Sequence, residues 1–204
     1  MAKSSSLDNK KRDLLLNELG EARIKIDESL HYYTGSRLDI PVDALYIATN
    51  QHELQKGLDV ALELDILTKV LGYDTIEVPK KAKKIDGLVI KNRTHQIKIS
   101  AIKGKFVIGS LGIDQVSLEI DSGVSLKELL DYFEKNKLVQ PIFTSPEQFT
   151  IGEVLSTEFG IQGMIEYIKV WEKGVVEEVN ILDFNHKKQI VLSIVVRVKS
   201  IRMI

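Results

Sequence analysis

A glycine turn followed by a basic segment is the first place where residue types in this sequence suggest chemistry. The stretch "KVLGYDTIEVPKKAKKIDGLVI", residues 69–90, reads as a short strand, a turn at Gly72, an irregular basic loop and a second strand. Glycine lets the backbone approach a bound group closely, and successive N–H groups in such a turn form an anion-binding nest. The layout is therefore typical of a loop that wraps a phosphate.

Asp74 is unfavourable in such a loop and leaves two interpretations open. A carboxylate about 4 Å from a phosphate charge costs about 4 kcal/mol at an effective dielectric near 20. The loop either binds phosphate in spite of this, or is a structural turn in which Asp74 accepts local N–H bonds. A lysine run that follows could offset the acid, although such runs are more often solvated faces; its members are Lys80, Lys81, Lys83 and Lys84.

Other reactive side chains are sparse. The chain has no cysteine, which excludes disulfides, thiolate metal sites and a cysteine nucleophile. Its four histidines lack the spacing of metal ligands, so no metal site is expected; they are His31, His52, His95 and His186. The residues alone nominate no catalytic acid, base or nucleophile.

The composition is that of an ordinary globular protein. The chain has 204 residues, which suits one domain or two small lobes, with 44% hydrophobic residues and a net charge of -1. The balanced charge gives no reason to expect a nucleic acid partner. No apolar run is long enough to cross a membrane, and residues 1–13 lack the apolar centre of a signal peptide, so we expect a mobile N-terminal tail and a cytoplasmic location.

The first half of the chain predicts a small sheet with parallel strands. Leucines 14, 15, 16 and 19 have helical spacing and end at Gly20. The segments "ARIKID", "DALYIAT" and "LTKVLG" read as strands. Asn50 and Glu53 form a capping-box pattern that opens a helix between the last two of these strands. A strand–helix–strand connection of this length favours parallel pairing.

From about residue 95 the pattern predicts a mostly antiparallel sheet. The segments "QIKISAI", "KFVIGSL" and "VSLEID" read as three strands, with "KGK" as a turn. Ser125 and Glu128 form one capping box and Thr150 and Glu153 another, each opening a helix. "MIEYIKVWEKG" and the final "KKQIVLSIVVRVKSIRMI" read as strands, the last of them long and central.

Set in order, these segments resemble the flavin-binding domain of the FAD-linked oxidases, the PCMH-type domain. That group includes glycolate-oxidase-like dehydrogenases and UDP-N-acetylenolpyruvoylglucosamine reductase. "VLGYDTI" is similar to its first glycine loop, and "TSPEQFTIGEVLSTEFGIQG" looks like its second. The resemblance implies a two-lobed α+β fold after a tail of residues 1–13. Residues 14–92 would form a lobe with a small parallel or mixed sheet, and residues 93–204 one with a larger antiparallel sheet and flanking helices.

The resemblance also implies FAD as the cofactor, with its diphosphate held by the two loops. The matching positions are Gly72, Tyr73, Asp74 and Thr75 in the first loop, and Thr150, Ile151, Gly152 and Gly160 in the second. Asp74 and Glu153 stand where the family usually has glycine. FAD binding is therefore either retained or lost.

Two functions follow from the resemblance. The chain is an FAD-binding domain of a flavin-dependent oxidoreductase that lacks its own substrate domain, or a flavin-free descendant that acts as a scaffold or interaction module. The sequence stops where the family's flavin domain stops, so we expect a substrate-domain subunit or self-association. The serine proton donor of the reductase branch has no counterpart in "LDFNHKKQIVLS".

Overall fold

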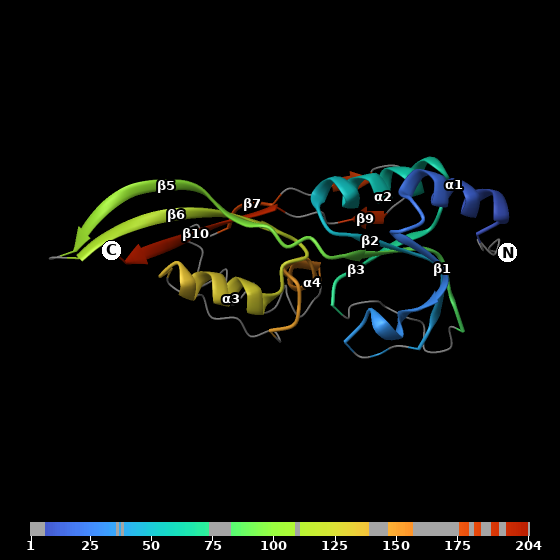
Figure 1. Cartoon of the computed structure of the whole chain (residues 1–204). Coiled ribbons are helices and arrows are strands. Elements are labelled where there is room, and N and C mark those ends of the chain that lie inside the picture. Colours follow the sequence, from blue (N-terminus) through green and yellow to red (C-terminus); the bar gives the residue numbers. More distant parts are fainter. Residues whose placement is uncertain are drawn as a thin grey trace. The chain divides into compact units, whose positions relative to one another are not determined.

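The computed structural model describes most of the first half of the chain and separate segments of the second (Figure 1). The described residues are 7–35, 37, 39–73, 83–108, 111–138, 147–156, 176–179, 182–184, 189–191 and 195–203. The chain forms two compact units, Met1–Thr94 and His95–Ile204, here called the first and second lobes.

The first lobe is built on a four-stranded mixed sheet. Its strands are β1 (Ile24–Ser29), β2 (Pro41–Ala48), β3 (Thr68–Leu71) and β4 (Ile85–Asn92). They lie in the order β1-β2-β4-β3, with β4 parallel to both β2 and β3, and β1 antiparallel to β2. The parallel pairing predicted from the strand–helix–strand pattern is confirmed.

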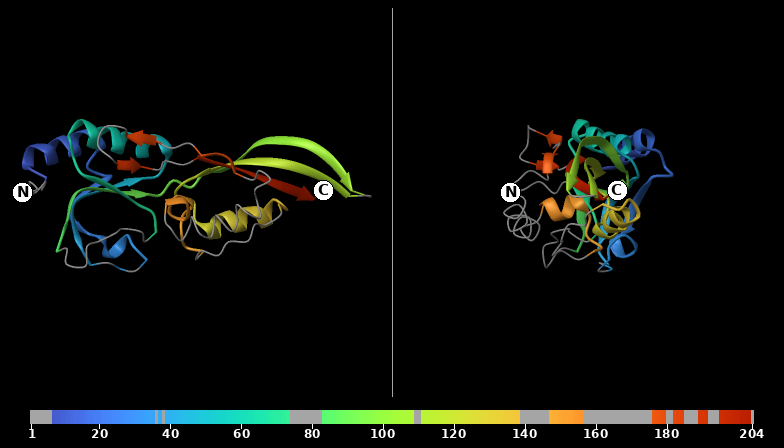
Figure 2. Two further views of the ribbon diagram at one scale, coloured as in Figure 1. Left: turned by 180° about the vertical axis from the view of Figure 1, so that it is seen from behind. Right: turned by 90° about the vertical axis from the view of Figure 1, so that its left-hand side faces the viewer.

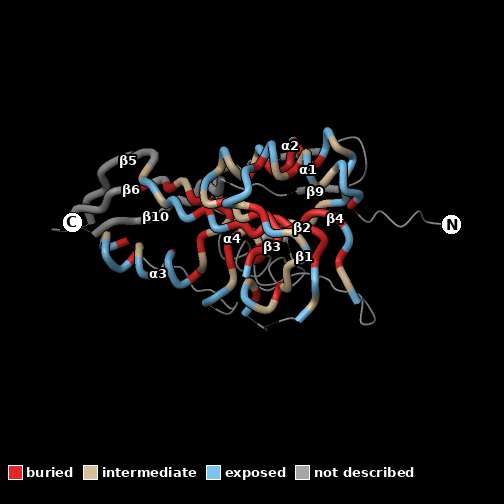
Figure 3. Tube along the Cα trace, turned by 45° about the vertical axis from the view of Figure 1, so that its right-hand side comes forward, coloured by how far each residue is buried: buried red, intermediate tan, exposed pale blue. Residues whose placement is uncertain are grey.

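Both faces of this sheet are covered. Helices α1 (Asn9–Leu19) and α2 (Gln51–Glu63) lie over one face, and η1 (Leu30–Tyr32) lies over the other, together with Tyr33 and Ile40 (Figure 1). Tyr46 and Ile90 contact α2 at Gly57, where an added Cβ would lie 2.8 Å from the Tyr46 ring. Because β2 and β4 are covered on both faces, nearly all of their residues are buried (Figure 3).

Two expectations for the first lobe need correction. Helix α1 begins at Asn9, because Asp8 caps it by accepting from the N–H of Lys11, and Leu7 is buried. The tail expected over residues 1–13 is therefore wrong from residue 7 onward; residues 1–6 lie outside the described residues. At α2, Asn50 does accept from the N–H of Glu53, but the Glu53 carboxylate binds Thr49 and Arg23 instead of the Asn50 N–H.

The second lobe is built on a four-stranded antiparallel sheet. Its strands are β5 (Ile97–Ile108), β6 (Leu111–Asp121), β7 (Val176–Val179) and β10 (Val195–Met203), in the order β5-β6-β10-β7. Figure 2 shows β5 and β6 as long ribbons beside α3 (Leu126–Lys135). The apolar side chains of α3 share a core with β6; they are Leu126, Leu129 and Phe133. A short helix, α4 (Ile151–Ser156), follows, and β8 (Leu182–Phe184) pairs with β9 (Gln189–Val191).

Two strand predictions for the second lobe are wrong, and a third lies outside the described residues. "KGK" is no turn, because β5 runs through Gly104 and only shifts register between Lys103 and Lys105. The long final strand is two strands, β9 in a hairpin with β8 and β10 between β6 and β7. Alternating apolar residues fit either pairing, so the pattern could not separate them. "MIEYIKVWEKG" lies outside the described residues.

The predicted α+β architecture is confirmed, with a mixed sheet in the first lobe and antiparallel sheets in the second.

Candidate functional site

The first glycine loop begins at the carboxyl edge of the parallel strands. Strands β2, β3 and β4 run in the same direction, so their carboxyl ends lie at one edge of the sheet. Gly72 and Tyr73 directly follow β3 at this edge; Gly72 is buried and Tyr73 is 36% exposed. Open sheets with parallel strands bind ligands at this edge. Asp74 and Thr75 lie outside the described residues.

A buried lysine lies beside this loop. Lys91 is on β4, in register with Leu71 of β3, and only 7% of it is exposed. Its Nζ donates a hydrogen bond to the carbonyl oxygen of Gly72. Lysine is almost never this buried unless its ammonium has a partner. Sequence reasoning missed Lys91, although a lysine at the end of the apolar run "GLVIK" was a signal for it.

The ring of Tyr73 packs against Gly35. A Cβ added to Gly35 would lie 2.1 Å from Cζ of the Tyr73 ring, so only glycine fits beneath the ring in this position. The Gly35 N–H also donates to the Tyr73 carbonyl, at 3.4 Å. The start of the first loop is thus held on two sides, by Lys91 of β4 and by Gly35.

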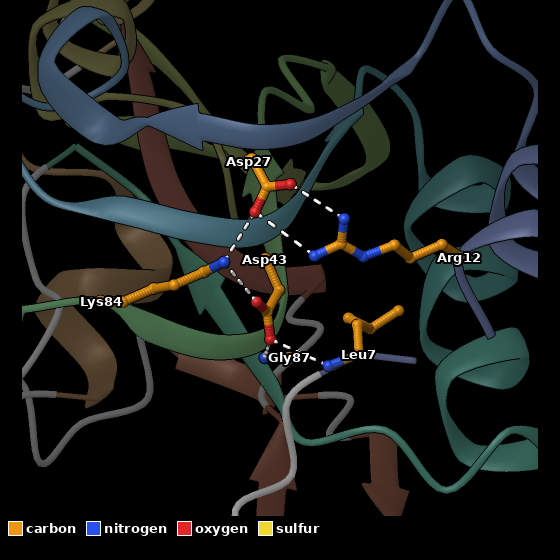
Figure 4. Close-up of polar contacts among 6 residues, drawn as sticks. All are labelled: Leu7, Arg12, Asp27, Asp43, Lys84 and Gly87. Atoms are coloured by element: carbon orange, nitrogen blue, oxygen red, sulfur yellow. Dashed lines mark hydrogen bonds and ion pairs between the residues drawn. The ribbon is translucent and has the colours of Figure 1, made fainter. Parts of the chain in front are cut away.

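Lys84, the last lysine of the run, forms ion pairs within the first lobe. Lys84 lies just before β4, and its Nζ is 2.7 Å from Oδ1 of Asp43 and 2.6 Å from Oδ1 of Asp27 (Figure 4). Arg12 binds the other oxygen of Asp27, at 2.9 Å. Lys84 and Lys91 are at opposite ends of β4, roughly 20 Å apart at about 3.3 Å per residue. Lys84 is therefore a structural ion-pair partner and not a charge for the loop.

The other oxygen of Asp43 joins three parts of the first lobe. Oδ2 accepts from the N–H of Gly87 at 2.9 Å and from the N–H of Leu7 at 3.2 Å. Burial opposes ionisation of Asp43, but its bonds to Lys84, Gly87 and Leu7 outweigh burial and lower its pKa. The hydrogen bond from Lys84 is the main cause that lowers the pKa of Asp27, and in return Asp27 and then Asp43 raise the pKa of Lys84.

The second glycine loop begins with a buried capping box. Glu153 is 3% exposed, and its Oε2 accepts from the N–H of Thr150 at 2.8 Å and from the Thr150 hydroxyl at 3.0 Å. The N–H of Glu153 donates back to that hydroxyl at 3.3 Å. The capping box predicted for Thr150 and Glu153 is confirmed, as is the box of Ser125 and Glu128 at α3.

The next two backbone N–H groups, of Ile151 and Gly152, also donate hydrogen bonds within the second lobe. The N–H of Ile151 donates to the Val124 carbonyl at 2.8 Å, and that of Gly152 to the Ser122 carbonyl at 2.7 Å. A Cβ on Gly152 would lie 3.0 Å from the same Ser122 oxygen, so this glycine permits a close backbone contact. The N–H groups of residues 150–153 thus all have protein acceptors. Gly160 lies outside the described residues.

Neither a metal cluster nor a spanning helix occurs in the described part of the chain. No group of three histidine, aspartate or glutamate side chains there could hold a metal ion. No helix there is both long enough and apolar enough to cross a membrane.

Comparison with known proteins gives structural matches only. No family model matches the chain, and no curated protein does. The structure is similar to a VAO-type flavoprotein from Myceliophthora thermophila C1, with a TM-score of 0.56 and 10% identity over 99% of this chain. It is also similar to alkyldihydroxyacetonephosphate synthase, with a TM-score of 0.54 and 13% identity over 100% of this chain. A third match is Phl p 4, a grass pollen allergen with glucose dehydrogenase activity, with a TM-score of 0.52 and 13% identity over 95% of this chain.

These matches extend over the whole chain but only part of each known structure. The chain spans 48%, 42% and 44% of the three proteins, in the order given above. At such low identity the likeness establishes the fold, and it agrees with the resemblance carried by the order of the sequence segments. The chain has a two-lobed α+β fold that is similar to the fold of these proteins, among them a VAO-type flavoprotein.

Proposed function

We propose that this chain is an FAD-binding domain of a flavin-dependent oxidoreductase. The observation that carries the proposal is the position of the first loop, because Gly72 and Tyr73 leave β3 at the carboxyl edge of the parallel strands in a flavoprotein fold. When bound, the isoalloxazine supplies the redox chemistry. The chain's own residues hold the diphosphate and position the ring.

The first loop has the features that a diphosphate requires. Gly72 is small and its backbone is buried against β4, and an ammonium lies directly behind it. We assign the backbone of Gly72 and Tyr73 to the diphosphate, together with Asp74 and Thr75 as predicted from the sequence. Asp74 is the unfavourable member of this set, since its charge repels the ligand.

The second loop fits a diphosphate less well at its described end. Thr150, Ile151 and Gly152 were predicted to hold the diphosphate through backbone N–H groups, but these groups already donate to Glu153, Val124 and Ser122. A contribution from these N–H groups would need each of them to leave its present acceptor. We therefore expect Gly160, at the far end of the predicted loop, to be the more important position there.

The proposal extends to partners. The three similar proteins are more than twice as long as this chain, so a complete enzyme of this fold includes further residues. We propose that a substrate-domain subunit or a second copy of the chain completes the substrate side of the flavin. A cytoplasmic location and the absence of nucleic acid and membrane partners stay predictions from composition.

The alternative is a flavin-free descendant that serves as a scaffold or interaction module. It is favoured by the closed hydrogen bonding at residues 150–153 and by the acids at two usual glycine positions, Asp74 and Glu153. This function needs the fold but not the cofactor. It predicts a protein that neither contains nor binds flavin.

Flavin absorbance distinguishes the two functions. The full chain is purified, its absorbance is recorded between about 350 and 500 nm, and FAD is then titrated and followed by flavin fluorescence and calorimetry. Saturable binding with a flavin spectrum supports the proposed function. A protein that is colourless and does not bind added FAD, while its circular dichroism shows a folded state, supports the scaffold. Riboflavin, which has no phosphate, is the matched ligand that reports on the ring alone.

A further inference from the structure

Lys91 is an unusual residue type for a buried position in a strand. Burying an ammonium costs free energy, and an apolar side chain would suit a strand that is otherwise buried from Leu88 to Ile90. The lysine instead places its charge against the carbonyl of Gly72, the first residue of the proposed diphosphate loop. Its neighbour in register, Leu71, is fully buried and apolar.

The contact sets the direction of the next donor. A trans peptide is planar, and its C=O and N–H groups point in opposite directions. The described residues contain no cis peptide. Because the Gly72 carbonyl points toward the Lys91 ammonium, the N–H of Tyr73 in the same peptide points away from Lys91. The Gly35 N–H holds the following carbonyl, that of Tyr73, and so fixes the orientation of this residue at both ends.

We infer that Lys91 is a positioning residue for the diphosphate of the ligand. It holds the Gly72–Tyr73 peptide so that the Tyr73 N–H is offered to a phosphate, and it places a positive charge behind the loop. This charge has the role that the sequence suggested for Lys80, Lys81, Lys83 and Lys84. The inference rests on the proposed function, because it assigns the diphosphate of FAD to this edge of the sheet.

Three variants of the full chain separate charge from structure. Lys91→Gln keeps a donor for the Gly72 carbonyl but removes the charge, and Lys91→Arg keeps both. Lys83→Gln is the matched control, since it removes an equal charge from an exposed residue near the other end of β4. Affinities for FAD, riboflavin and inorganic pyrophosphate are measured for each variant by calorimetry and fluorescence, and folding is checked by urea unfolding.

The expected result is a phosphate-specific loss. Lys91→Gln should bind FAD and pyrophosphate about tenfold to a hundredfold more weakly than wild type, because bonds and contacts to charged groups are worth about that much. Riboflavin affinity should not change, whereas a merely structural defect would lower it as well. Lys91→Arg and Lys83→Gln should stay within about threefold of wild type.

Each contrary result has its own meaning. If wild type binds FAD and Lys91→Gln binds it equally well, the inference is wrong and the proposed function stands. If wild type binds pyrophosphate but not FAD, the proposed function is wrong, and the role of Lys91 in holding a diphosphate is retained only if Lys91→Gln binds pyrophosphate more weakly. Binding of neither overturns both. Should Lys91→Gln not fold, pyrophosphate is titrated into ¹⁵N-labelled wild type; the Tyr73 amide and Lys91 ammonium signals should shift, and unchanged signals overturn the inference.

Discussion

Asp43 and Lys84 form an ion pair of 2.7 Å in which the aspartate side chain is 1% exposed and the lysine side chain 35% exposed. The pair joins β2 to the segment that leads into β4, and the same carboxylate binds the N–H groups of Leu7 and Gly87. A buried carboxylate of this kind depends on its partners, because unpaired charge in the interior is costly. The pair is therefore a stability element of the first lobe.

Replacing Lys84 with Met should destabilise the first lobe. The change leaves Asp43 with two backbone donors but no cation, and we expect a loss of about 1–3 kcal/mol, reduced by the partial exposure of Lys84 to water. Urea unfolding at neutral pH measures the difference. Lys83→Met is the matched control, since Lys83 is exposed, and it should change stability by less than about 0.5 kcal/mol. Equal effects of the two variants would show that the ion pair contributes nothing.

The stability of the chain should fall in acid because of Asp43 and Asp27. Their pKa values are lowered in the folded state below the ordinary 3.8. A lowered folded-state pKa contributes stability above the unfolded-state pKa, and this contribution is lost as the pH falls through the folded-state value. Unfolding free energy measured from pH 6 to pH 2 should drop below about pH 4. Asp43→Asn should be less stable at pH 6 and should show a shallower acid dependence; an unchanged slope would exclude Asp43 as a cause.

At alkaline pH the same cluster should lose Lys84. Its pKa is raised above 10.5 by Asp27 and Asp43, so its contribution is complete below that value and is lost as the pH rises through the folded-state pKa. Wild type should therefore lose more stability than Lys84→Met between pH 10 and pH 12. Urea unfolding across that range makes the comparison.

Two glycine-to-alanine changes should differ in cost. In Gly87 the φ angle is +90°, and an added Cβ would lie 2.1 Å from the backbone oxygen of Leu67. Gly87→Ala should therefore lose about 2 kcal/mol or more, since neither the φ angle nor the backbone contact relaxes easily. Gly35→Ala meets only the outer end of the Tyr73 ring, which is partly exposed and can turn aside.

The expected loss of stability for Gly35→Ala is below about 1 kcal/mol. Its main effect should be on the first loop, because the Tyr73 ring must leave its place. Under the proposed function, FAD affinity should change in Gly35→Ala while the unfolding free energy stays nearly constant. A large loss of stability with unchanged FAD affinity would contradict this.

Asp74→Gly should strengthen FAD binding. If half of the ~4 kcal/mol repulsion between Asp74 and the diphosphate is real, affinity should rise by well over tenfold. Glu153→Gly should gain less, because the Glu153 carboxylate is turned to Thr150, and should cost about 1–2 kcal/mol of stability through the lost capping box. An FAD titration of wild type and both variants makes the test. Tight binding by wild type, or no gain in Asp74→Gly, would exclude Asp74 as the obstacle.

Glu128 provides a control for the cost of losing a capping box. It forms the same reciprocal bonds with Ser125 at α3 but is exposed. Glu128→Gly should therefore lower stability without changing FAD affinity.

Local patterns in the sequence determined the elements and much of their pairing. The spacing of apolar residues and the capping boxes at Ser125 and Thr150 act over a few residues, so they could be read directly. The strand–helix–strand order after residue 43 was enough for the parallel sheet, because a connection of that length cannot form a hairpin. The order of all segments was enough for the resemblance to a flavin-binding fold.

The tertiary structure decided which residues meet at the loops. Lys84 and Lys91 are both lysines near β4, but one ends in an ion pair with Asp43 and the other beneath Gly72. This difference depends on strand register, which the sequence alone did not give. The N–H groups of Ile151 and Gly152 likewise find acceptors about 27 to 30 residues earlier in the chain. Contacts between distant segments arise only when the strands pack, so the loop sequences alone could not show which residues lie at the described ends of the two loops.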